Sequence, residues 1–208
     1  GTREGVPALV ALLQASQAQA TFLFSLGPDH TGRAITRALR PDFLKKVGRT
    51  SVLEHYGMKT LLYGTLLPAP NIAKRCKAIL QSVAEAGFEV GVHVFDHIRW
   101  QDKVAGKDAA WTATEMQLAF ACFEDIFGFP AQTHGAAGWQ MNREAFRLEQ
   151  KMQLNYASDT RGSHPFIPIW EAEIIQCPQV PSTLPTLDEL IGLGSITINN
   201  VADYILNL

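Results

Sequence analysis

The sequence has few cysteines and no excess of basic residues. Its three cysteines, Cys76, Cys122 and Cys177, are far apart and form no CxxC pair. This spacing favours the reduced structural thiols of a cytosolic protein over a disulfide framework. Lysine and arginine number 18 against 20 aspartates and glutamates, which gives a formal net charge of −2. This balance does not favour a nucleic-acid partner.

Long hydrophobic runs are also missing. No apolar run is long enough to span a membrane, and no signal peptide is recognisable. The composition is that of an ordinary globular protein, with 47% hydrophobic and 18% charged residues over 208 positions. This length suffices for one domain with a buried core.

Helical and extended patterns alternate along the chain. Helices are expected over about 3–17, 71–86, 142–152 and 199–208, and a further helix should open at Thr112 or Thr114 and stop before Gly128. Strands are expected over 20–26, 88–92, 132–136, 154–157 and 174–177. Such repeated units predict an α/β fold with a parallel sheet or barrel. The chain starts on a helix, so we expect an incomplete unit, or else an open sheet that begins on a helix.

Two histidines four residues apart, His93 and His97, directly follow the expected strand 88–92. Two imidazoles at this spacing can face one divalent cation. An isolated HxxxH pattern is more often structural, but other polar groups also follow expected strands: Asp29 and His30, the stretch 134–139, and Asp159 with Arg161. The carboxyl ends of parallel strands form one edge of the sheet. This convergence favours a metal-dependent hydrolase.

Nearly the whole chain resembles the polysaccharide deacetylase family, whose members remove acyl groups from sugars. The matching stretches are Gly1–Val6, Ser25–Asp29, Gly32–Arg33, Tyr56–Gly57, Gly64–Thr65, Glu89–His93, Asp96–His97, Trp100–Gln101, Ala136–Trp139, Tyr156–Asp159, Arg161–Gly162, Pro181, Thr183–Thr186 and Asp188–Glu189. Many of them are specific to a branch that removes the N-formyl group from undecaprenyl-phosphate-linked 4-formamido-4-deoxy-L-arabinose, a step in lipid A modification.

The resemblance implies a distorted (β/α) barrel and a divalent metal held by one aspartate and two histidines, which correspond to His93 and His97. It places the aspartate ligand and the catalytic base upstream of Gly1, and the acid histidine beyond Leu208. We therefore expect a single domain over 1–208 that lacks its first and C-terminal strands and is inactive alone. Mixed imidazole and carboxylate ligands suit zinc, manganese, cobalt or nickel.

The resemblance also implies roles for residues after the later strands. Asp159 would orient the acid histidine, although a salt bridge with Arg161 is an alternative. Arg161 is a candidate clamp for the phosphodiester of the substrate, and Arg33 is a weaker candidate with a solvated surface role as its alternative. Asp96 is either a group that supports the metal ligands or a simple cap.

The stretch Ala136–Trp139 replaces an arginine-containing stretch of ordinary deacetylases. Gly138 permits close backbone approach, and Trp139 offers either a face for a sugar ring or a core contact. His134 and His164 are interpreted mainly as structural residues.

The implied lipid-linked amino sugar suggests a peripheral enzyme on the cytoplasmic face of the bacterial inner membrane. Residues Val52–Pro70 are apolar with few charges, and form either a loop packed on the barrel or a platform for the polyprenyl chain. Two other functions stay open: deacetylation of another amino sugar, and a non-catalytic module that binds a sugar lipid.

Overall fold

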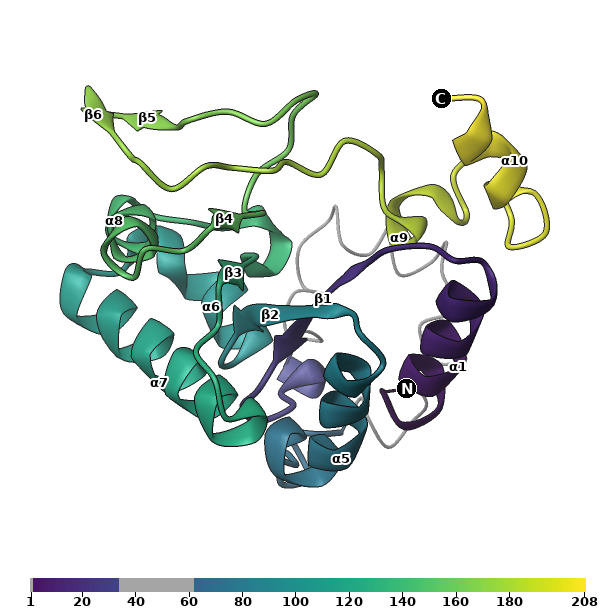
Figure 1. Cartoon of the computed structure of the whole chain (residues 1–208), viewed down its shortest axis with the longest axis horizontal. Coiled ribbons are helices and arrows are strands. Elements are labelled where there is room, and N and C mark those ends of the chain that lie inside the picture. Colours follow the sequence, from purple (N-terminus) through teal and green to yellow (C-terminus); the bar gives the residue numbers. More distant parts are fainter. Residues whose placement is uncertain (1, 34–61) are drawn as a thin grey trace.

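The computed structural model describes residues 2–33 and 62–208, in which helices and strands alternate (Figure 1). The helices are α1 (Thr2–Ala15), α5 (Ile72–Glu85), α6 (His97–Lys103), α7 (Ala109–Phe127), α8 (Arg143–Lys151), α9 (Leu187–Leu190) and α10 (Val201–Leu206). The strands are β1 (Thr21–Ser25), β2 (Glu89–Val94), β3 (Thr133–His134), β4 (Tyr156–Ala157), β5 (Ile169–Trp170) and β6 (Glu173–Ile174). No described helix has both the length and the apolar character needed to cross a membrane.

The first four strands form one parallel sheet whose spatial order, β1-β2-β3-β4, follows the chain (Figure 1). Val92 of β2 pairs with His134 of β3, and His134 pairs with Ala157 of β4. Parallel strands end at the same edge of a sheet. The residues that follow these three positions, including His93 and Gly135, therefore lie together at the carboxyl edge. The α/β class and the parallel sheet predicted from the sequence are confirmed.

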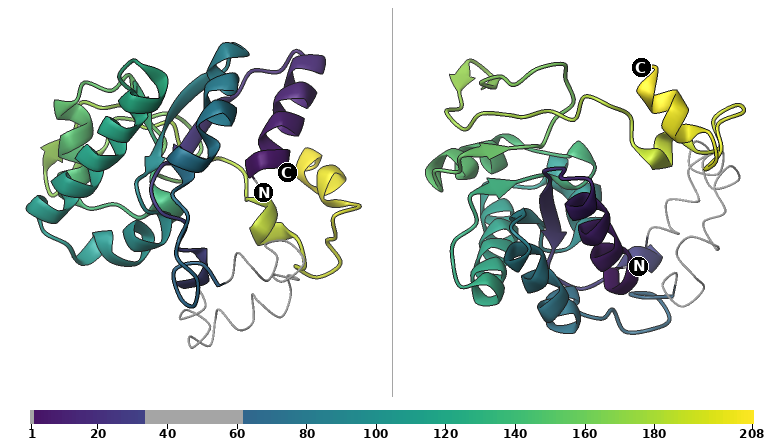
Figure 2. Two further views of the ribbon diagram at one scale, coloured as in Figure 1. Left: turned by 90° about the horizontal axis from the view of Figure 1, so that it is seen from below. Right: turned by 45° about the vertical axis from the view of Figure 1, so that its right-hand side comes forward.

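Helices α5 and α7 lie side by side and cover one face of β1 and β2 (Figures 1 and 2). The period-two pattern of the strands turns alternate apolar side chains toward these helices. The buried cluster consists of Phe22, Phe24, Leu26, Ala73, Cys76, Leu80, Val83, Phe88, Val90, Val92, Ala119, Phe123, Ile126 and Ala131. This core holds β2 rigidly, and β2 carries His93.

Side chains at the helix starts explain where the helices begin. Asn71 caps α5 and Asn142 caps α8, at the starts of the two helices expected over 71–86 and 142–152. The predicted start of α7 at Thr112 or Thr114 is wrong. Asp108 lies one turn before Thr112 and caps the helix instead. Its carboxylate accepts a hydrogen bond from the Trp111 amide at 2.9 Å. Thr112 is buried in the first turn, where its hydroxyl donates to the Asp108 carbonyl.

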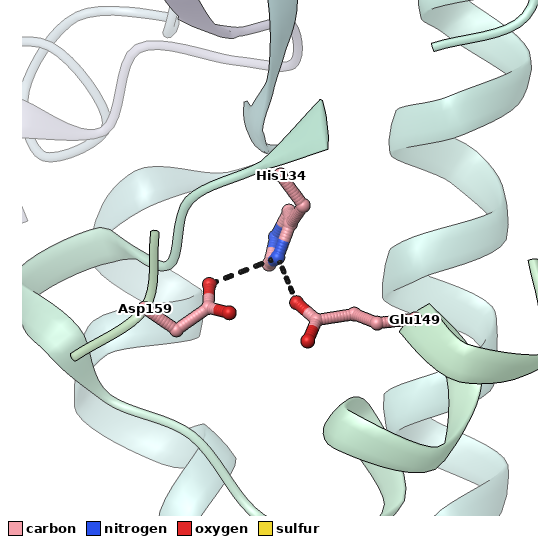
Figure 3. A group of neighbouring side chains, drawn as sticks. All are labelled: His134, Glu149 and Asp159. Atoms are coloured by element: carbon pink, nitrogen blue, oxygen red, sulfur yellow. Dashed lines mark hydrogen bonds and ion pairs between the residues drawn. The ribbon is translucent and has the colours of Figure 1, made fainter. Parts of the chain in front are cut away.

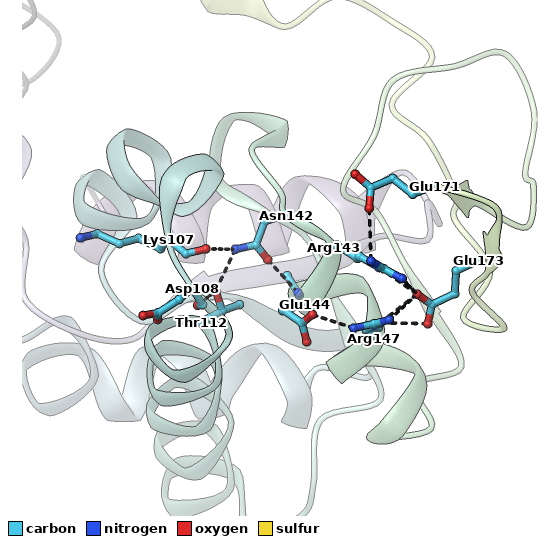
Figure 4. Close-up of polar contacts among 10 residues, drawn as sticks. Lys107, Asp108, Thr112, Asn142, Arg143, Glu144, Arg147, Glu171 and Glu173 are labelled. Atoms are coloured by element: carbon cyan, nitrogen blue, oxygen red, sulfur yellow. Dashed lines mark hydrogen bonds and ion pairs between the residues drawn. The ribbon is translucent and has the colours of Figure 1, made fainter.

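The predicted strand 174–177 does not enter the parallel sheet. Its start pairs with β5 in an antiparallel hairpin that lies apart from the main sheet (Figure 1). Arg143 and Arg147 of α8 hold the hairpin through Glu173, with N–O distances of 2.8 and 2.7 Å (Figure 4). The chain then returns beside β4, where Gln179 forms a bridge with Ala157. Of the predicted apolar platform, residues 52–61 lie outside the described part of the chain.

Candidate active site

Two histidines meet at the carboxyl end of β2. His93 is the penultimate residue of β2, and His97 is the first residue of α6. Their ring centroids are 5.1 Å apart and the ring planes are inclined by 47°. Both residues are half-buried. The fold therefore brings the two expected metal ligands together at the edge where parallel α/β folds place their chemistry.

A backbone carbonyl fixes the orientation of His93. Its Nδ1 lies 2.5 Å from the carbonyl oxygen of Gly135. Because a carbonyl oxygen can only accept a hydrogen bond, Nδ1 carries the proton and Nε2 keeps a free lone pair. Burial and the neighbouring His97 lower the pKa of His93 to about 3, so the ring is neutral near pH 7. A neutral imidazole with one free nitrogen is the form that binds a divalent metal. The donor pair thus fits the metal that the resemblance implies.

Asp96 lies between the two histidines in the sequence, but other groups occupy its carboxylate. Its Oδ1 accepts a hydrogen bond from the Arg99 amide and caps α6, and its Oδ2 lies 2.5 Å from Nδ1 of His30. The residue is buried. Asp96 therefore fixes the start of α6, and with it the position of His97. This agrees with its interpretation as a cap or supporting residue.

A second cluster, which we call the buried network, consists of His134, Glu149, Asp159 and Gln179. Figure 3 shows the first three of these residues. Nδ1 of His134 lies 2.6 Å from Oε1 of Glu149 and 3.1 Å from Oδ1 of Asp159. The amide group of Gln179 donates to Asp159 at 2.9 Å and to Glu149 at 3.3 Å. All four side chains are at most 1% exposed.

The three titratable groups of the buried network all have shifted pKa values. Burial alone would lower the pKa of His134, but the charge of Asp159 and hydrogen bonds to both carboxylates raise it to about 10. Burial would raise the pKa of Asp159, but the charge of His134 and its hydrogen bonds hold it below the usual value. Burial and the charge of Asp159 raise the pKa of Glu149 well above its usual value. Of the two carboxyl groups, Glu149 is therefore the one that keeps its proton to the higher pH.

Three atoms of this network lie as close together as the ligands of a metal site, and among the described residues this is the one such group of three. Two ligands of a single zinc ion, each about 2.0–2.2 Å from the metal, lie roughly 3.3 Å apart. The 2.6 Å between His134 and Glu149 is instead the length of a charge-assisted hydrogen bond. We therefore interpret the cluster as a hydrogen-bond network.

Arg161 and Trp139 lie against each other. The guanidinium carbon of Arg161 is 4.1 Å from the Trp139 ring centroid, and its Nη2 pairs with Oε2 of Glu189 at 2.5 Å. Trp139 donates to the Ser182 hydroxyl at 3.1 Å. The alternative salt bridge between Asp159 and Arg161 is wrong, because each of the two pairs with another partner. Trp139 is half-buried, so its ring is not a core residue.

Gly138 sits in the short turn between β3 and α8, with a φ of +62°. A Cβ atom at this position would lie 2.3 Å from Nε2 of Gln101. The glycine therefore allows the turn to approach the side chain of Gln101 in α6, which agrees with the close approach expected of it.

The sequence reasoning missed Glu149, Gln179, Ser182 and Glu189 as parts of the site. Glu149 had a usable signal, because it follows Ala145 and Phe146 by four and three positions and so shares their buried helix face. An acid on such a face must find a partner. The other three belong to segments whose position depends on the return of the chain beside β4.

No family model matches the chain. Two curated proteins are similar over its whole length. The probable 4-deoxy-4-formamido-L-arabinose-phosphoundecaprenol deformylase ArnD of Shewanella sediminis is 38% identical over 208 residues, which make up 67% of that protein. The protein of the same name from Wigglesworthia glossinidia brevipalpis is 34% identical over 209 residues, or 72% of its length. A candidate polysaccharide deacetylase of known structure from Mycobacterium smegmatis matches 90% of this chain and 70% of its own, with a TM-score of 0.52 and 17% identity. This last likeness concerns the fold alone.

Proposed function

The chain belongs to the 4-deoxy-4-formamido-L-arabinose-phosphoundecaprenol deformylase family, and from this we propose that the protein is a metal-dependent amide hydrolase. Its substrate in this proposal is undecaprenyl-phosphate-linked 4-formamido-4-deoxy-L-arabinose, from which it removes the N-formyl group. The product is the amino sugar that modifies lipid A. One observation carries the proposal: two histidines meet at the carboxyl end of β2, and a carbonyl leaves Nε2 of His93 free.

His93 and His97 would hold the cation, and the resemblance implies an aspartate as the third ligand. When bound, a divalent cation supplies a Lewis acid that polarises the formyl carbonyl and lowers the pKa of water. The chain contributes the rigid frame for this chemistry. The Gly135 carbonyl orients His93, and the Asp96 cap places His97.

The remaining site residues fit the other parts of the substrate. Arg161 carries a permanent charge and a planar fork of donors, which suits the phosphodiester. Gly138 and Trp139 form the turn beside it, and we assign them to the sugar ring. The resemblance assigns Asp159 to the support of the acid histidine. In the described chain its carboxylate already holds the 134–136 segment through the Ala136 amide.

A lipid-linked substrate requires contact with the bilayer surface. We propose that the protein acts peripherally at the cytoplasmic face of the inner membrane. Leu66, in the described end of the apolar stretch 52–70, is 81% exposed, which supports a membrane contact there.

The test uses the protein expressed from its complete gene, with the lipid-linked formamido sugar and its acetamido analogue. Release of formate at a much higher rate than acetate supports the proposal. Faster release of acetate would indicate a deacetylase. Binding of the sugar lipid with no release of either acid would indicate a non-catalytic module.

A further inference from the structure

A single peptide group connects His93 to the buried network. The carbonyl oxygen of Gly135 lies 2.5 Å from Nδ1 of His93. The amide of Ala136, which belongs to the same peptide group, donates to Oδ1 of Asp159 at 2.7 Å. The two side chains thus bind the opposite ends of one planar unit. A carboxylate acceptor at the N–H end polarises the peptide and makes its carbonyl a stronger acceptor.

Both oxygens of the Asp159 carboxylate have side-chain partners. His134 from β3 approaches one oxygen at 3.1 Å, and Gln179 donates to the other at 2.9 Å. The side-chain oxygen of Gln179 also accepts from the Asp159 amide at 3.0 Å. Glu149 from α8 completes the arrangement by binding His134 at 2.6 Å (Figure 3). Side chains from β3, α8 and the returning chain therefore converge in the network around Asp159.

Burying four polar side chains is costly unless every group finds a partner. Each of these four has a partner, and the network leads, through one peptide, to a nitrogen at the candidate metal site. The ring plane and the tautomer of a metal-binding histidine depend on the acceptor at its second nitrogen. The buried network determines where that acceptor lies.

We propose that His134, Glu149 and Gln179 are positioning residues. They fix Asp159, which through the Gly135–Ala136 peptide locks His93 in the Nδ1–H tautomer with Nε2 available to a divalent cation. This inference rests on the proposed function, because it takes His93 as a metal ligand. It gives Asp159 a second role, distinct from support of an acid histidine.

The first test measures the tautomer of His93 in the metal-free protein at pH 7 by long-range ¹H–¹⁵N NMR. A His93→Asn variant assigns the signals. We expect the Nδ1–H form in the unmodified protein, although Nε2–H is the commoner form of a free imidazole. Observation of Nε2–H would overturn the proposal. This measurement does not depend on activity, so it can succeed even if the protein proves not to be a hydrolase.

The second test measures the Zn²⁺ affinity of variants by competition with a chromophoric chelator. Asp159→Asn and Glu149→Leu should each weaken zinc binding by about 10- to 100-fold and raise the fraction of Nε2–H at His93. Glu149→Gln keeps a neutral acceptor for His134 and should restore the affinity to within about threefold of the unmodified protein.

Phe146→Ala provides the matched control. Phe146 lies on the same buried face of α8 as Glu149 but packs in an apolar cluster. The Phe146→Ala substitution should lower the stability of the protein while leaving its zinc affinity and the His93 tautomer unchanged. If Glu149→Leu and Asp159→Asn behave in the same way as Phe146→Ala, the network is only structural and the proposal is wrong. If Glu149→Leu fails to fold, the comparison of Asp159→Asn with Phe146→Ala decides the question.

Discussion

The guanidinium of Arg161 lies over the ring of Trp139, with 4.1 Å between its central carbon and the ring centroid, while its Nη2 pairs with Glu189. The Trp139 ring and the Glu189 carboxylate hold the Arg161 guanidinium in a fixed position. A preorganised guanidinium loses less entropy when it binds an anion. This relationship is the basis for assigning the phosphodiester to Arg161.

Arg161→Lys should raise KM for the lipid-linked substrate about tenfold and change kcat by less than a factor of three. Lysine keeps the charge but loses the planar fork and the contact with Trp139. Steady-state kinetics of formate release measures both constants. Arg143→Lys, in the ion-pair group that holds the β5–β6 hairpin, is the control and should leave KM unchanged. Equal KM values for the two variants would contradict the assignment of Arg161 to substrate binding.

Gly138→Ala should destabilise the protein by about 1–3 kcal/mol, since the position combines a positive φ with a clash against Gln101. The substitution should also lower formate release, because the turn would shift. Gly106→Ala is the matched control, as a Cβ atom there meets nothing within 4 Å. Urea unfolding of both variants gives the comparison. If Gly138→Ala proves as stable as Gly106→Ala, the close approach of the turn is not required.

The free energy of unfolding should fall as pH rises above neutrality. Glu149 and His134 both have raised pKa values, so each keeps its proton in the folded state after the unfolded chain has lost it. Rising pH therefore favours the unfolded state, for His134 between about pH 6.5 and the folded pKa of about 10. The slope should be about 1.4 kcal/mol per pH unit for each such proton.

Glu149→Gln isolates one of these protons, because glutamine does not titrate. Urea unfolding at several values between about pH 5 and pH 9 should show a smaller total loss of stability for this variant than for the unmodified protein, because the folded-state pKa of Glu149 lies well above its usual value. Equal losses would mean that the pKa of Glu149 is not raised in the folded protein.

Leu66→Ser should weaken association with phospholipid vesicles that carry undecaprenyl phosphate, since the side chain is 81% exposed in the described end of the apolar stretch. Sedimentation with vesicles measures the bound fraction. Leu118→Ser serves as the control, because Leu118 lies in α7 and is 44% exposed. Equal binding of the two variants and the unmodified protein would exclude a membrane contact at Leu66.

Local patterns predicted most of the secondary structure. The caps at Asn71 and Asn142 and the stop at Gly128 follow from side-chain and backbone preferences that act within one turn. The missed start of α7 has the same kind of cause, because Asp108 is as good a cap as a threonine. The meeting of His93 and His97 was also predictable, since a strand end followed by one helical turn fixes their spacing.

The buried network could not be predicted from local patterns. His134 and Asp159 meet because β3 and β4 pair in parallel with His134 beside Ala157. Gln179 joins them only because the chain returns beside β4 after the hairpin. Strand register and the path of a long connection depend on the packing of the whole domain. The sequence therefore assigned His134 to structure without indicating its partners.

The most direct test of the account is formate release after removal and return of the metal. Protein expressed from its complete gene is treated with a chelator and dialysed, and formate release from the lipid-linked substrate is measured before and after addition of one equivalent of Zn²⁺, Mn²⁺, Co²⁺ or Ni²⁺. We predict loss of at least 100-fold on chelation and recovery with at least one of these ions, but no recovery for the His97→Asn variant. Undiminished formate release in the chelated protein, or full recovery by His97→Asn, would contradict the assignment of the histidine pair as the metal site.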